Sequence, residues 1–335
     1  MHLGPGRALG LDGYIERIKP LIAMLRAKYP AVPVVAPGTP VGRVGDRASD
    51  SFHDWNKALA KLPGITGFSQ YGWTEFGGQQ RLGAGRGAAG DDTPASIWRK
   101  YDEFVSSFPA RQISVYQSDW GADKKMFMTQ WGTHADRNTP LQGLHLANFY
   151  FFLAQYNAAH EDYFAVATSS VNLALEASRN AHQDGTVYRE KIVLLTPYLY
   201  SKPFRHLFSG DKRLLTASVK GPKGDGQGQT VKALAAASPD GRKFLYLLNT
   251  GPSVALGRVT FDAEALSDGL VVQIESAFGD PASPPGAATA RRAASASANT
   301  FTGEKVLRDL VLEPSSLTLL ILPSRASGKL EQSTH

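Results

Sequence analysis

Hydrophobic and polar residues along the first two-thirds of the chain follow two spacings, one typical of helices and one of buried strands. Apolar residues recur every three or four positions over residues 11–29, which predicts a helix, and a short apolar run follows at 32–37. The same alternation predicts helices over 50–62, 93–108, 140–156 and, with an interruption, 188–208, and strands over 65–71, 126–129 and 163–167. Strands that alternate with helices favour parallel βα units.

The pattern changes near Leu214, where short β-type runs begin, separated by turns rich in Gly, Pro and Asp. Pro239-Asp240-Gly241 is the clearest hairpin signal among these turns. The predicted strands cover 216–219, 231–237, 243–248, 259–261, 270–275 and 317–322. We expect an antiparallel β-sandwich over 213–325, with a loop rich in Ala, Ser and Pro at 282–299 and a disordered tail at 326–335.

The composition of the chain excludes several kinds of site and partner. With no cysteine in the chain, a disulfide framework, thiol catalysis and thiolate zinc sites are excluded. The net charge of +6 forms no dense basic tract, so we expect no nucleic-acid partner. No window approaches the ~18 apolar residues of a membrane span. The N-terminus has no signal-peptide pattern, which favours a cytoplasmic protein, or a secreted or periplasmic one if a segment precedes Met1.

The most distinctive segment is Thr129-Gln130-Trp131-Gly132, where a buried strand ends in a polar residue, an aromatic and a glycine. With the order of strands, helices and sandwich, it resembles clan-A retaining glycoside hydrolases of the α-L-arabinofuranosidase and β-xylosidase types. The resemblance implies a partial (β/α)8 TIM-type barrel over 1–212, made of the fifth to eighth strands. In that family the seventh strand ends in the nucleophilic glutamate, at the position of Gln130, and the fourth in an Asn-Glu pair. This chain contains no Asn-Glu dipeptide.

The candidate catalytic residues follow from this comparison. Retaining hydrolysis uses two carboxyl groups about 5 Å apart, and an amide at position 130 can be neither nucleophile nor anion. The resemblance makes Tyr71 an aromatic that hydrogen-bonds the nucleophile. Glu75 and Asp119 are the carboxylates that could replace the missing acid/base, although loop carboxylates are commonly just solvated.

Aromatic residues near strand ends are the candidate substrate-binding groups. Sugar rings stack on flat aromatic faces, which suits Trp73, Trp131 and Trp120, and His134 could bond a sugar hydroxyl. Rim packing is the alternative for the tryptophans.

No metal or cofactor is expected. His53-Asp54 and His160-Glu161-Asp162 lack metal-ligand spacing and are predicted to be solvated. Residues 85–90 fit G-x-G-x-x-G without the strand that a dinucleotide site needs, so we interpret them as a loop.

Three hypotheses remain open. The chain is a glycoside hydrolase with further barrel strands upstream of Met1, a non-catalytic protein that binds oligo- or polysaccharide, or a half-barrel scaffold. Open sheet edges in a half-barrel would be relieved by a homo-oligomer that completes the barrel.

Overall fold

The computed structural model describes residues 10–39, 50–74, 94–133, 139–169, 196–219, 230–251, 254–255, 260–261, 264–265, 271–278, 299–302 and 311–324. The chain divides into two compact units. The first contains Met1–Gln80, Glu103–His134 and Tyr156–Val171, and the second contains the remaining residues. Helices α3 (Pro94–Phe108) and α5 (Pro140–Ala159) contribute residues to both units.

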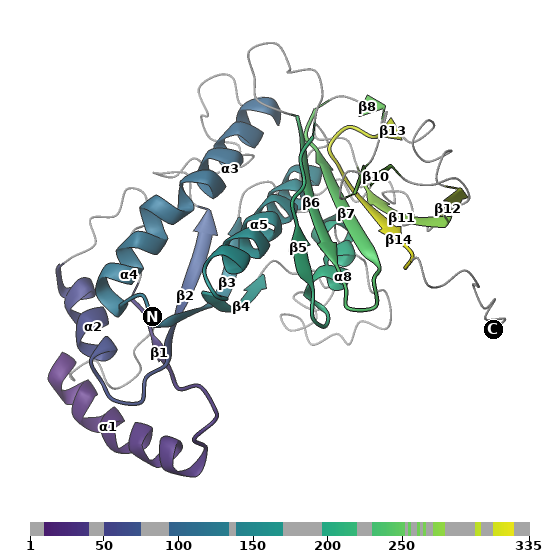
Figure 1. Ribbon diagram of the computed structural model, residues 1–335. Helices are drawn as coiled ribbons and strands as arrows, with labels where there is room; N and C mark the ends of the chain where they lie inside the picture. Colours follow the sequence, from purple (N-terminus) through teal and green to yellow (C-terminus); the bar gives the residue numbers. More distant parts are fainter. Residues whose placement is uncertain are drawn as a thin grey trace, which may run out of the picture. The chain divides into compact units, whose positions relative to one another are not determined.

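The first unit is built on a parallel sheet of four strands in the order β1-β2-β3-β4 (Figure 1). The strands are β1 (Val35–Pro37), β2 (Gly67–Thr74), β3 (Lys125–Thr133) and β4 (Phe164–Ser169). Gly67 begins β2 at a point of close approach, because a Cβ there would lie 2.5 Å from the Lys125 carbonyl oxygen. A glycine is therefore required where these two strands enter the sheet.

Helix α4 (Ser114–Trp120), joined to α3 by a π-helical turn at Pro109–Ile113, packs on one face of the parallel sheet. Helix α2 (Asp50–Ala60) packs against α4, and α1 (Leu11–Lys28) contacts α2 through Tyr14 and Trp55. Phe68 of β2 stacks on Trp120 of α4 with ring centroids 4.9 Å apart, and Met126 and Met128 of β3 are fully buried. These residues form the hydrophobic layer behind the sheet.

The second unit is built on an antiparallel sheet of six strands in the order β12-β11-β14-β7-β6-β5 (Figure 1). Two strand pairs, β10-β9 and β13-β8, accompany it. Its helical segments are α7 (Thr196–Ser201), the 3-10 turn η2 (Lys202–Phe204) and α8 (Arg205–Phe208). The strands are β5 (Arg213–Leu215), β6 (Val231–Ala237), β7 (Lys243–Asn249), β8 (Val254–Ala255), β9 (Thr260–Phe261), β10 (Glu264–Ala265), β11 (Val271–Ala277), β12 (Asn299–Thr302), β13 (Val311–Leu312) and β14 (Ser316–Leu322).

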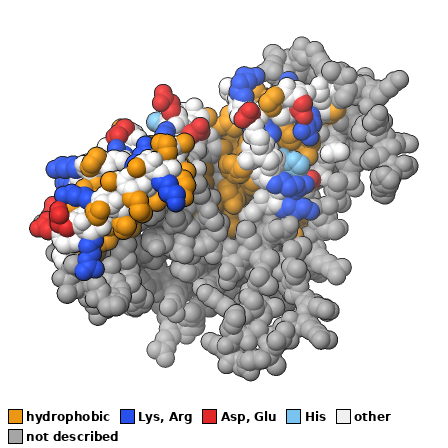
Figure 2. Space-filling model, turned by 90° about the horizontal axis from the view of Figure 1, so that it is seen from below, with side chains coloured by type: hydrophobic (Ala, Val, Ile, Leu, Met, Phe, Trp, Pro, Cys, Tyr) orange, Lys and Arg blue, Asp and Glu red, His pale blue; other side chains and the backbone are white. Residues whose placement is uncertain are grey.

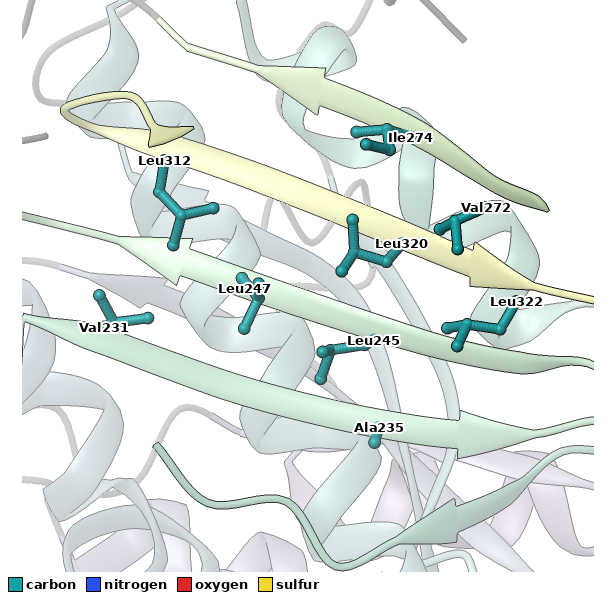
Figure 3. Close-up of a cluster of buried hydrophobic side chains, with 9 residues drawn as sticks. All are labelled: Val231, Ala235, Leu245, Leu247, Val272, Ile274, Leu312, Leu320 and Leu322. Carbon is teal, nitrogen blue, oxygen red and sulfur yellow. The ribbon is translucent and has the colours of Figure 1, made fainter. Parts of the chain in front are cut away.

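Both faces of the antiparallel sheet are packed. Figure 3 shows the cluster on one face, in which Leu245, Leu320 and Ile274 of adjacent strands are joined by Leu312 of β13. On the other face Tyr246 stacks on Phe204 of η2 with centroids 5.1 Å apart. Every residue of β14 is buried as a result.

Most predicted elements are confirmed, including the βα alternation and the hairpin turn at Gly241, which has a φ of 86°. The strand predicted over 216–219 is wrong, because the segment that pairs with β6 is Arg213–Leu215. Helix α4 was not predicted at all. The described part of the predicted 188–208 helix is interrupted at η2, whereas 188–195, most of the 282–299 loop and the 326–335 tail lie outside the described residues. The structure has a six-stranded antiparallel sheet in this region, and the β-sandwich over 213–325 stays a prediction.

Candidate functional site

The carboxyl ends of β2 and β3 bring together the residues that the sequence marked as chemical candidates. The backbone register pairs Tyr71 with Gln130 and Trp73 with Gly132. The sequence predictions Tyr71, Trp73 and Gln130 therefore share one end of two neighbouring parallel strands, the end at which α/β proteins build their sites. Their side chains lie outside the described part of the structure.

A β-bulge sets this register. Met128 pairs with Gln70 and Gln130 with Tyr71, so Thr129 is an extra residue in β3. The pairing with β4 skips at the same place, from Met128 to Trp131. In an unshifted strand the buried series of Met126 and Met128 would continue at position 130, and the bulge moves it to Trp131, which is 1% exposed.

A buried polar network lies behind the strand ends. The side-chain amide of Gln70, in β2, donates to the Thr39 carbonyl oxygen at 2.7 Å and to the Tyr116 hydroxyl at 2.5 Å. Thr39 follows β1 and Tyr116 belongs to α4, so one fully buried amide ties two strands to a helix. These two hydrogen bonds hold the side chain of Gln70, the residue before Tyr71, to the segment after β1 and to α4.

The network continues to Asp119, whose side chain is fully buried. One carboxylate oxygen lies 2.9 Å from Nδ1 of His53 and accepts a hydrogen bond from the Asn56 amide at 3.1 Å. Asn56 Oδ1 in turn accepts from the Thr39 backbone at 2.9 Å. A buried carboxylate needs such donors to offset its desolvation, and this one has them.

His53 and Asp54 were both expected to be solvated, which is confirmed for Asp54 and wrong for His53. Its side chain is 29% exposed and held against Asp119. The available signal was the spacing of His53 and Asn56, which lie three residues apart and so share one face of α2. The prediction that His160, Glu161 and Asp162 are solvated is confirmed, because all three residues are exposed.

The remaining sequence candidates are dispersed. Trp120 is 2% exposed and stacks on Phe68 within the hydrophobic layer. Trp131 is also buried in that layer. Asp119 lies in the polar network among the helices rather than at a strand end. Glu75 and His134 lie outside the described residues.

The second unit has its own buried polar groups. Glu275 of β11 accepts from Arg205 at 2.5 Å and lies 3.3 Å from His206 Nε2. Burial lowers the pKa of His206 despite its bond to Glu275, and burial within α5 lowers the pKa of His145 to about 3. Among the described residues there is no group of three or more His, Cys, Asp or Glu that could hold a metal ion, and no described helix is long and apolar enough to cross a membrane.

No protein-family model matches this chain, and no curated protein matches its sequence. Solved structures do match. A GH51 arabinofuranosidase from Xanthomonas axonopodis pv. citri is 15% identical, with a TM-score of 0.56 over 95% of this chain and 64% of its own. A second arabinofuranosidase is 13% identical, with a TM-score of 0.60 over 94% and 62%. A GH86 protein with a glutamate-to-glutamine substitution, in complex with neoagarooctaose, is 10% identical, with a TM-score of 0.52 over 96% and 48%.

These similarities show a glycoside-hydrolase-like fold, in agreement with the resemblance of the sequence. The chain spans less than two thirds of the length of each of these structures.

Proposed function

We propose that this glycoside-hydrolase-like chain binds an oligo- or polysaccharide at the carboxyl end of its parallel sheet, with Gln130 at the nucleophile position. The observation that carries the proposal is the register that sets Tyr71 beside Gln130, with Trp73 two residues further along β2. Glutamine offers both a donor and an acceptor to sugar hydroxyls, and aromatic faces suit sugar rings. In this proposal residues 1–212 form part of a (β/α)8 barrel and 213–325 a sandwich.

The proposed function is binding rather than cleavage. Hydrolysis with retention needs two carboxyl groups, and the chain has an amide at position 130 and no Asn-Glu pair. The GH86 neighbour carries a glutamate-to-glutamine substitution and is in complex with neoagarooctaose, which supports the view that a protein of such a fold can bind an oligosaccharide while a glutamine stands in place of a glutamate.

Titration calorimetry with arabino-oligosaccharides and neoagarooctaose tests the binding. We expect saturable heat from at least one of these ligands and its loss in Trp73→Ala. Phe208→Ala, at a 54% exposed aromatic in the second unit, is the matched control and should bind normally. Absence of saturable binding across the panel would refute the proposed function.

Gln130→Glu separates a binding protein from an enzyme that lacks its nucleophile. We expect the variant to release no aryl alcohol from aryl α-L-arabinofuranosides above the unmodified chain, because the acid/base is still missing. A clear gain in hydrolysis would instead favour the alternative of a glycoside hydrolase, with its acid/base supplied by Glu75, since Asp119 is buried among the helices.

A further inference from the structure

Helix α1 presents an apolar surface to solvent. Along its 18 residues only Ile22 is buried. Five large hydrophobic side chains on or just after the helix, here called the α1 face, are 40–56% exposed: Leu21, Met24, Leu25, Tyr29 and Val32. Figure 2 shows hydrophobic side chains gathered along α1, flanked by Lys and Arg. A contiguous apolar surface of this kind marks an interaction site.

The parallel sheet beside α1 is open at both edges. Among the described strands, β1 has only β2 as a neighbour and β4 has only β3. All four strands run in the same direction. An unpaired edge exposes backbone donors and acceptors that another strand can satisfy, and parallel sheets normally have both faces covered.

We propose that a second copy of this chain docks on the α1 face and closes the sheet. A two-fold axis would pair β4 of each copy with β1 of the other, in parallel, so that two four-stranded sheets form one eight-stranded barrel. Tyr14 contacts Trp55 of α2 with centroids 5.3 Å apart, so α1 already packs on one side. Its open face would cover the junction between β1 and the partner's β4.

Charge favours this arrangement. Arg26 and Lys28 occupy the last turn of α1, just before β1. Glu161 and Asp162 are exposed in the turn just before β4. Both pairs lie at the amino end of an edge strand, and parallel pairing of β4 with the partner's β1 sets these ends side by side. The basic end of α1 therefore meets the acidic turn of the other copy, twice per dimer.

A lipid surface would also accept an apolar helix with basic flanks. It would leave the strand edges unpaired and would gain nothing from the acidic turn, so a second copy accounts for more of the observations. The inference depends on sheet edges and charge rather than on sugar binding, and the two proposals fail independently.

Sedimentation velocity tests the association. We expect the chain to be a dimer at micromolar concentration and Met24→Glu to be a folded monomer, judged by circular dichroism. Phe208→Glu, at an equally exposed apolar residue of the second unit, is the control and should remain dimeric. A chain that is monomeric throughout, or a dimer indifferent to Met24→Glu, overturns the proposal, as does α1-dependent binding of the monomer to anionic phospholipid vesicles.

Charge reversal tests the orientation. Lys28→Glu and Glu161→Lys should each weaken the dimer by about tenfold, because the contact occurs twice. The double variant should restore the original dissociation constant. Since the chain has no cysteine, Lys28→Cys with Glu161→Cys and a short bis-maleimide should give a covalent dimer, whereas either single variant should not. Additive charge effects, or no covalent dimer, contradict the proposed orientation.

Discussion

The two sheets of this protein are stabilised differently. The antiparallel sheet of the second unit has central strands, β7 and β14, in which nearly every residue is buried, and apolar layers on both faces. The parallel sheet of the first unit places buried polar groups, Gln70, Asn56 and Asp119, behind its strands, and no other described strand pairs with its edges. The antiparallel sheet is therefore stabilised mainly by the packing of its apolar side chains. The parallel sheet depends more on its buried hydrogen bonds and on what covers its edges.

The largest effect should come from the centre of the antiparallel sheet. Leu320→Ala removes a side chain that is fully buried within the cluster of Figure 3. We expect the free energy of unfolding of the second unit to fall by about 3 kcal/mol, as lost burial and a cavity add. Hydrogen exchange of the β7 and β14 amides measures it. Val311→Ala, at a 48% exposed residue, should change little, and equal effects would refute the assignment of the core.

In the parallel sheet the sensitive group is a carboxylate. Asp119→Ala leaves the His53 and Asn56 donors without their acceptor. The cost should be about 2 to 3 kcal/mol, the penalty of unsatisfied buried groups. Urea unfolding monitored by exchange of the β2 and β3 amides reports it. Asp123→Ala removes an exposed carboxylate nearby and serves as the control; a loss as large there would mean that burial of Asp119 is unimportant.

Acid should weaken the second unit. The unfolded chain protonates His145 near its ordinary pKa of about 6.5, whereas burial lowers the folded-state pKa to about 3. Stability therefore falls as the pH drops through this window, by about 2 kcal/mol at about pH 5. The lowered pKa of His206 acts in the same direction. Urea titrations at several pH values should show the slope, and His145→Gln should remove most of it.

The smallest effect concerns a turn. Gly241, between β6 and β7, has a φ of 86°, and an added Cβ would lie 3.0 Å from the Ser324 hydroxyl oxygen. Gly241→Ala should cost about 1 kcal/mol, because a side chain is strained at positive φ. Thermal unfolding measures the loss. Pro239→Ala in the same turn should be milder, and the reverse order would contradict the strain argument.

The elements themselves were predictable because they depend on local patterns. Helix α5 and strand β3 are examples, each found near its true position. Helix α4 was missed because Pro109 reads as a stop signal, whereas the chain passes through it in a π-helical turn. The mixed α/β class, with a parallel sheet and an antiparallel sheet, followed from the order of elements, and the solved structures show a glycoside-hydrolase-like fold, whereas the partial barrel stays a prediction.

The site was predictable only in part. That Tyr71 and Gln130 end neighbouring strands follows from the βα order, but their direct pairing depends on the extra residue at Thr129, which no composition signal marks. The bond between His53 and Asp119 joins residues 66 positions apart and depends on the packing of α2 against α4. Contacts of that range arise from tertiary structure, and a single sequence carries no periodicity that reveals them.

The bulge at Thr129 makes one residue at the end of β3 dispensable for the register between β3 and β2. Removing Thr129 would make Gln130 and Trp131 the first and second residues after Met128, so ordinary alternation would still pair Gln130 with Tyr71 and keep Trp131 in the buried series. A variant library that randomises positions 129 and 130 at fixed length therefore varies the strand end while sparing the layer behind it. Deletion of either residue would spare that layer as well, because Trp131 would then follow Met128 by two positions, the spacing of one strand face.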